Sequence, residues 1–119
     1  MPHTLNAQAS ILIIDDEPQI RKFLDIALRA QGYQVQVAEN GMKGLETLAT
    51  RGADLLILDL GLPDMDGQEV LTELRQWSDI PVIVLSARPD ENQKIKLLDA
   101  GANDYVTKPF SIQELCARI

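Results

Sequence analysis

Residues 55–63 read LLILDLGLP, an unbroken apolar run that ends at one carboxylate, Asp59. A short run of this kind is typical of a strand that is buried on both faces of a parallel sheet. Pro63 prevents a simple continuation of the strand, so we expect Asp59 at its exit. Ligands bind at the carboxyl ends of strands in open α/β sheets. Asp59 is therefore either a helix-capping residue or a group with a chemical role.

The rest of the chain alternates strand-like and helix-like segments. Apolar runs predict strands at 11–14, 35–37, 80–85 and 105–107, besides the strand that ends at Asp59. Helical periodicity predicts helices at 18–31, 41–51, 70–77, 92–100 and 112–119, three of them ended by Gly32, Gly52 and Gly101. Five strands that alternate with helices predict an α/β fold with a doubly wound, flavodoxin-like parallel sheet, order 2-1-3-4-5. The valines at 35 and 37 alternate with glutamines, which places that strand at the sheet's edge.

Composition limits the classes of function. The 119 residues include 18 acidic and 11 basic side chains, a net charge of -7, which argues against nonspecific binding to nucleic acid. The single cysteine, Cys116, excludes an internal disulfide and indicates a reducing compartment. It falls on the apolar face of the last helix, where a core thiol is expected. No apolar stretch is long enough for a membrane span, and residues 1–9 lack a signal-peptide pattern, so we expect a cytoplasmic protein without a membrane partner.

The sequence predicts a loose tail at 1–9 and one domain at 10–119. The last helix has only about two turns when the chain stops, and we expect no polar cap on it. A helix of this length is marginal on its own. We therefore expect that the chain is part of a longer protein or that its end belongs to a linker.

Polar side chains follow the ends of four predicted strands. Asp15 and Asp16 follow the first strand, Asp59 the third, Ser86 the fourth and Lys108 the fifth. Two carboxylates about 5 Å apart repel by roughly 3 kcal/mol at an effective dielectric constant near 20. A cluster of three therefore needs a proton or a divalent cation, and oxygen ligands suit Mg²⁺.

This chemistry makes Asp59 a candidate nucleophile that forms an acyl phosphate. Lys108 and Ser86 could then hold phosphoryl oxygens. Each residue also has a purely structural interpretation: the first two acids could cap a helix, Ser86 could bond to backbone, and Lys108 could be a surface charge. For Asp64 and Asp66 the structural interpretation is favoured, since they fit the loop before the third helix.

At these residues the sequence resembles the receiver domains of two-component response regulators. The matching motifs are IDDE at 14–17, LDLGLPDMDG at 58–67, LSA at 85–87 and DYVTKPF at 104–110. The resemblance implies a phosphoacceptor, Asp59, that is phosphorylated by a sensor histidine kinase and has no separate substrate. It implies that Asp16, Asp59 and the Gly61 carbonyl bind Mg²⁺, with Asp15 reaching it through water. It also implies that Ser86 and Lys108 hold the phosphoryl group, and that the bond between residues 108 and 109 is cis.

The resemblance further implies a switch. Phosphorylation would draw Ser86 inward, let Tyr105 rotate toward the interior and change a face made by the fourth helix, fifth strand and fifth helix. The charges on that face resemble the subclass that carries a winged-helix DNA-binding domain and dimerises there. Intersubunit pairs are then expected between Lys94 and Glu114 and between Asp104 and Arg118. Asp99 matches a third position, whose partner would lie beyond residue 119, and DNA would be bound only by a C-terminal domain absent from this chain.

Three other classes share parts of this pattern. A flavin mononucleotide-binding module needs a hydroxyl- and glycine-rich phosphate loop after the first strand, where this chain has Asp15, Asp16 and Glu17, which would repel phosphate. An aspartyl phosphatase of the dehalogenase type needs a second Asp two positions after the nucleophile, where this chain has Gly61. A receiver that is never phosphorylated usually lacks part of the acidic set, which is complete here.

Overall fold

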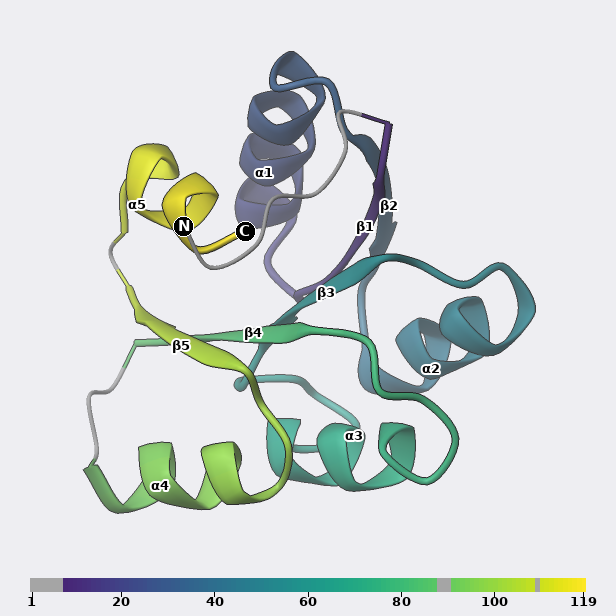
Figure 1. Cartoon of the computed structure of the whole chain (residues 1–119), viewed down its shortest axis with the longest axis vertical. Coiled ribbons are helices and arrows are strands. Elements are labelled where there is room, and N and C mark those ends of the chain that lie inside the picture. Colours follow the sequence, from purple (N-terminus) through teal and green to yellow (C-terminus); the bar gives the residue numbers. More distant parts are fainter. Residues whose placement is uncertain (1–7, 88–90, 109) are drawn as a thin grey trace.

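Five parallel strands form one sheet between two layers of helices (Figure 1). This arrangement comes from a computed structural model, which describes residues 8–87, 91–108 and 110–119. The strand order is β2-β1-β3-β4-β5, as predicted from the sequence. The strands are β1 (Ser10–Ile14), β2 (Gln34–Ala38), β3 (Leu55–Asp59), β4 (Val82–Ser86) and β5 (Asp104–Thr107).

The central strand β3 is buried along its whole length and ends at Asp59, as its apolar run predicts. It pairs with β1 on one side and with β4 on the other, and Asp59 lies opposite Leu85. Strand β4 begins two residues later than expected, at Val82. Pro81 has no N–H to donate to a sheet ladder, although its carbonyl still accepts a hydrogen bond from Leu56 N at 3.0 Å.

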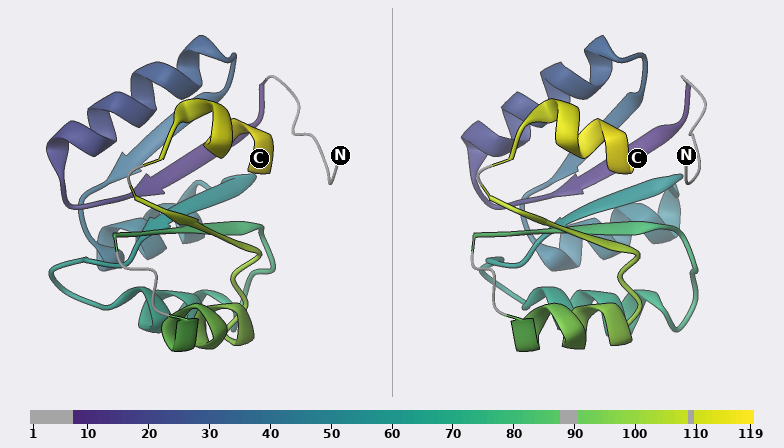
Figure 2. Two further views of the ribbon diagram at one scale, coloured as in Figure 1. Left: turned by 90° about the vertical axis from the view of Figure 1, so that its left-hand side faces the viewer. Right: turned by 60° about the vertical axis from the view of Figure 1, so that its left-hand side comes forward.

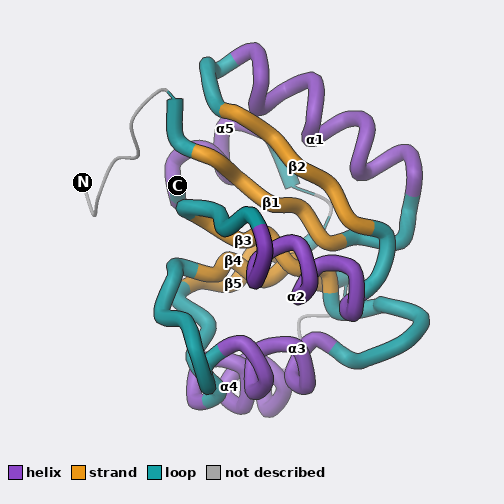
Figure 3. Tube along the Cα trace, turned by 90° about the vertical axis from the view of Figure 1, so that its right-hand side faces the viewer, coloured by secondary structure: helices purple, strands orange, loops and turns teal. Residues whose placement is uncertain are grey.

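The helices lie on both faces of the sheet. Helices α1 (Pro18–Ala30) and α5 (Ile112–Arg118) cover one face, and α2 (Gly41–Thr50), α3 (Gly67–Leu74) and α4 (Glu91–Asp99) cover the other (Figures 1, 2 and 3). Each face carries its own apolar core: Leu24, Leu28 and Leu115 belong to one, and Leu45, Leu71 and Leu97 to the other. Cys116 packs against the first of these cores, as expected of a structural thiol. Within the described part of the chain, every helix is too short or too polar to traverse a bilayer.

Two details at helix ends differ from the sequence predictions. Helix α3 ends at Leu74, and Trp77 lies beyond it in a turn closed by a hydrogen bond from its N–H to Leu74 O. The Trp77 side chain is 46% exposed, so the expectation that it belongs to the helix and packs at its end is wrong. Helix α5 does have a polar cap, because the Ser111 hydroxyl accepts a hydrogen bond from Glu114 N at 3.0 Å.

Candidate functional site

A pocket of about 450 Å³ opens at the carboxyl ends of the strands, where ligands of doubly wound sheets bind. Predicted site residues from four segments of the chain line it: Asp16, Asp59, Gly61, Ser86 and Lys108. Parallel pairing explains the convergence, since β1, β3, β4 and β5 are neighbours and all end at this edge. Glu17, Leu60 and Ala87 complete the lining.

Lys108 is the positive centre of this pocket. Its Nζ donates a hydrogen bond to Asp59 Oδ1 at 2.8 Å and lies 3.6 Å from Asp15 Oδ2 and 3.5 Å from Glu17 Oε1. Burial alone would lower the pKa of the Lys108 ammonium, but the hydrogen bond and charge of Asp59 outweigh it and raise the pKa. The ammonium is therefore held charged, aimed at the carboxylate of Asp59. The interpretation of Lys108 as a surface charge is wrong, because its side chain is only 15% exposed.

Asp15 is completely buried behind the pocket. Its Oδ1 accepts a hydrogen bond from Glu17 N at 2.9 Å, whereas its buried Oδ2 has no hydrogen-bond partner among the described residues. Burial is the main cause that raises the pKa of Asp15 to about 6, opposed by the Glu17 bond and reinforced by the charge of Asp59. The Lys108 ammonium, 3.6 Å away, offsets part of the charge of Asp15 Oδ2, but without a hydrogen bond the burial of this oxygen is costly unless a second cation or a proton joins it.

The acids at this edge fit a divalent cation. Carboxylate oxygens of Asp15, Asp16 and Glu17 lie within 4.8 Å of one another, and such oxygens are the ligands that Mg²⁺ prefers. The alternative role of Asp15 and Asp16 as helix caps is wrong. The N-cap of α1 is Glu17, whose side chain makes no capping hydrogen bond in the described structure.

The loop after β3 starts close to the Asp59 carboxylate. Gly61 N donates a hydrogen bond to Asp59 Oδ2 at 3.2 Å, so both oxygens of Asp59 have a donor. Ser86, the last residue of β4, is 4% exposed, and its carbonyl accepts a hydrogen bond from Lys108 N at 2.7 Å. This backbone hydrogen bond fixes the position from which the Lys108 side chain leaves the backbone, relative to β4. Pro109, and with it the expected cis bond, lies outside the described residues.

Glu17 is the site residue that sequence reasoning missed. It lines the pocket and faces Lys108, although only the two preceding acids were expected there. The signal was its adjacency to Asp15 and Asp16 directly before a helix.

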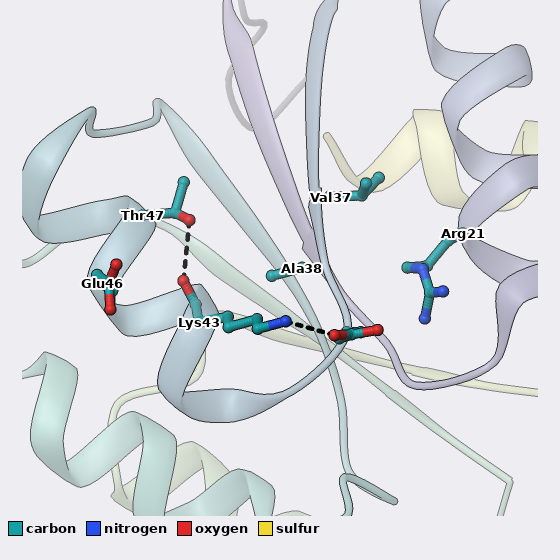
Figure 4. Close-up of a pocket in the computed structure, with 7 residues that line it drawn as sticks. Arg21, Val37, Ala38, Lys43, Glu46 and Thr47 are labelled. Carbon is teal, nitrogen blue, oxygen red and sulfur yellow. Dashed lines mark hydrogen bonds and ion pairs between the residues drawn. The ribbon is translucent and has the colours of Figure 1, made fainter.

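A second hollow lies beside the edge strand and is lined by Arg21, Lys43 and five other residues (Figure 4). The Lys43 ammonium in this hollow donates a hydrogen bond to Glu39, which balances the positive charge of Lys43.

The predicted dimer face carries its charges at the surface. Arg118 Nη1 bonds both carboxylate oxygens of Asp104 in the same chain, at 2.9 and 3.0 Å. Lys94 Nζ lies 5.8 Å from the centre of the Tyr105 ring, and Tyr105 is 6% exposed. Asp99 and Glu114 are exposed. Asp104 and Arg118, expected to pair between subunits, thus pair within this single chain.

The fold and this pocket define a class of protein. Residues 11–119 match the family model described as "Response regulator receiver domain", and the chain belongs to that family. It is thus a receiver domain of a two-component response regulator, and such a domain is a phosphoacceptor rather than an enzyme with its own substrate.

Within the family, the chain is similar to regulators of the Kdp operon. It is 57% identical over 92% of its length to the "KDP operon transcriptional regulatory protein KdpE" of Escherichia coli (strain K12). The chain covers 49% of that relative and spans about half the length of the curated relatives it matches. Two solved structures share the fold. The receiver domain of the Francisella response regulator 1452 has 37% identity and a TM-score of 0.89, covering 93% of both chains. The BeF3-activated N-terminal receiver domain of Klebsiella pneumoniae RstA has 28% identity and a TM-score of 0.87, covering 92% of this chain and 93% of that one.

Proposed function

We propose that this receiver accepts a phosphoryl group on Asp59 from a phosphohistidine of a sensor kinase. The observation that carries the proposal is the arrangement around Asp59. A lysine ammonium lies 2.8 Å from one of its oxygens, in an open pocket beside which the buried Asp15 Oδ2 has no hydrogen bond within the described structure. This arrangement suits the binding of a phosphoryl group together with a cation.

The transfer is an in-line displacement. An Asp59 carboxylate oxygen forms a bond to phosphorus while the phosphorus–nitrogen bond of the donor breaks, and the electron pair leaves with the imidazole. Lys108 then pairs with a phosphoryl oxygen instead of the Asp59 carboxylate, and the Ser86 hydroxyl bonds a second one. The product is an acyl phosphate on Asp59.

Mg²⁺ is the proposed cofactor. Asp16, Asp59 and the Gly61 carbonyl would hold it directly, and Asp15 would reach it through water. When bound, it offsets the negative charge of the carboxylates and of the phosphoryl group. Asp15 also has a local task, because its Oδ1 accepts the Glu17 N–H and thereby shapes the turn that places Asp16 at the pocket.

The rival classes fit the site less well. The acids at 15–17 would repel a flavin phosphate, and Gly61 supplies no acid to protonate a leaving group.

The proposed output is a dimer formed through α4, β5 and α5, in a longer protein whose C-terminal domain binds DNA. The likeness to the E. coli regulator supports control of potassium-transport genes as that output. We further propose that residues 10–119 form the receiver. Ala9, predicted to lie in the tail, is buried, and its carbonyl accepts a hydrogen bond from Gln34 N at 2.9 Å.

Incubation with acetyl phosphate and Mg²⁺, followed by intact mass spectrometry, tests this function. We expect one phosphoryl group on the wild type, none on Asp59→Asn, and a normal amount on Asp25→Asn. Asp25 is a matched control because it lies on α1, in an exposed pair with Arg29. Undiminished phosphorylation of Asp59→Asn would show that the proposed acceptor is wrong.

A further inference from the structure

Part of the N-terminal cap of helix α2 comes from a loop that is distant in the sequence. The first N–H groups of a helix have no partner within it and need acceptors from elsewhere. Asn40 supplies an acceptor for one of them, because its side chain accepts from Lys43 N at 2.8 Å, whereas the bond from Gly44 N to Asn40 O at 3.1 Å is the first regular bond of the helix. Asp64 supplies the other two, because its Oδ1 accepts from Gly41 N at 2.8 Å and its Oδ2 from Met42 N at 2.9 Å. Two residues thus satisfy three donors, and only Asn40 belongs to the helix's own chain segment.

Asp64 lies in the loop that connects β3 to α3, and this loop begins at the functional site. Gly61, three residues before Asp64, bonds the Asp59 carboxylate through its N–H. Two residues after Asp64, Asp66 caps α3 in a capping box with Glu69. The loop is therefore fixed at both ends. The hydrogen bonds that Asp64 accepts join the middle of the loop to a third element, α2.

Close packing accompanies these hydrogen bonds. A Cβ added to Gly41 would lie 3.0 Å from Met65 Sδ and 3.0 Å from Val70 Cγ2, so a glycine at this position lets the loop approach the helix. The Asp64 carboxylate also meets the positive end of the helix dipole, a favourable place for an anion. Burial raises the pKa of Asp64, but the backbone bonds from Met42 and Gly41 outweigh it and lower the pKa. The contact is thus made by a charged carboxylate at neutral pH.

We propose that Asp64 is a positioning residue that anchors the β3–α3 loop onto α2 and so holds the Gly61 backbone in place for Mg²⁺. The anchoring stands on the hydrogen bonds above, whereas its effect on the metal rests on the proposed function. Release of the anchor leaves Asp59, Asp16 and Lys108 untouched but frees the loop that carries Gly61. Coupling of this kind is reciprocal, so bound Mg²⁺ should in turn strengthen the bond between Asp64 and Met42 N.

A pair of variants separates anchoring from helix capping. Asp64→Ala and Asn40→Ala each remove a cap from the same end of α2, so we expect comparable falls in the thermal unfolding midpoint. Only Asp64→Ala detaches the loop. Amide hydrogen exchange of the metal-free protein should therefore show Gly61 exchanging faster in Asp64→Ala than in Asn40→Ala.

The NMR shift of the Gly61 amide, recorded during a titration with Mg²⁺, measures the effect of each variant on Mg²⁺ affinity. We expect Asp64→Ala to weaken Mg²⁺ binding by about tenfold, the lower end of the range for residues that support metal ligands. Asn40→Ala should bind Mg²⁺ like the wild type. The milder Asp64→Asn keeps one acceptor and should fall between the two.

The outcomes keep the two proposals apart. Equal Gly61 exchange in Asp64→Ala and Asn40→Ala would overturn the anchor, whatever the metal result. Faster exchange in Asp64→Ala with unchanged Mg²⁺ affinity would overturn the effect on the metal. A wild type that neither binds Mg²⁺ nor accepts phosphate would refute the proposed function and the metal effect together, while the exchange data would still decide the anchor.

Discussion

Asp15 is the most completely buried charged residue at this site. It is fully buried, one of its oxygens lacks a hydrogen bond in the described structure, and its pKa is raised from 3.8 to about 6. A raised carboxyl pKa means that the folded state holds its proton more tightly than the unfolded state. Stability is therefore lost as pH rises from the ordinary pKa through the raised one, and the full cost is present above about pH 6.

We predict that Asp15→Asn raises the free energy of unfolding at pH 7.5 by about 1–3 kcal/mol in the absence of Mg²⁺. The gain should shrink as pH falls from about 6 toward 4, because the wild-type carboxyl then takes up its proton. Urea unfolding at a series of pH values measures this. Asp16→Asn is the control, since it removes a neighbouring charge that is exposed. A gain that is independent of pH, or equal in both variants, would contradict the burial argument.

Some site residues were visible in the sequence, and others were not. Asp15, Asp59, Ser86 and Lys108 each follow an apolar run, and parallel pairing necessarily gathers such strand ends at one edge. The anchoring role of Asp64 was not visible, because its acceptors bond a helix 23 positions earlier in the chain. No local pattern encodes such a pairing, and Asp64 was expected only to shape its own loop.

At the scale of elements, α2 packs closely against β1, the strand that leads into the site. A Cβ added to Gly44 would lie 2.1 Å from Ile14 Cδ1 and 2.5 Å from Cγ1. Ile14 is completely buried and directly precedes Asp15, so it has little room to move. The close approach of α2 to the sheet thus requires glycine here, for reasons of space rather than backbone conformation.

Gly44→Ala should therefore lower the free energy of unfolding by about 1–3 kcal/mol, the usual range for overpacking, despite the better helix propensity of alanine. Chemical denaturation measures the change. Glu46→Ala, on the exposed face of the same helix, should have an effect near zero. A Gly44→Ala variant as stable as the wild type would show that α2 can move away from β1 at little cost.

Element type and order followed from periodicity, because buried parallel strands read as short apolar runs and the helices as amphipathic ones. Element ends were harder to predict. The apolar run at 80–85 includes Pro81, which cannot donate to the ladder, and Trp77 extends the helical spacing of α3 beyond its last turn. At Pro81 the missing backbone donor overrides the side-chain pattern, and at Trp77 the chain has already turned out of the helix.

At the scale of the whole molecule, the proposed output is a dimer whose charged pairs cross between subunits. Beryllofluoride with Mg²⁺ mimics an acyl phosphate and should convert the monomer to a dimer in sedimentation velocity. We predict that Lys94→Glu and Glu114→Lys each weaken this dimer, because like charges then meet across the interface.

An equimolar mixture of the two variants should restore the dimer, because every Lys–Glu pair across the interface is then complementary. Arg51→Glu, an exposed change at the end of α2, is the control and should dimerise normally. If the mixture behaves no better than either variant alone, Lys94 and Glu114 do not pair between subunits.

The central claim is that the phosphoryl group is carried by the side chain that ends the middle strand. Borohydride reduction after acetyl phosphate treatment converts a phosphorylated aspartate to homoserine, and peptide mapping by mass spectrometry locates it. The account predicts homoserine at position 59 alone, and only when Mg²⁺ is present during phosphorylation. Homoserine at another aspartate, or an unmodified Asp59 in protein that has taken up phosphate, would contradict it.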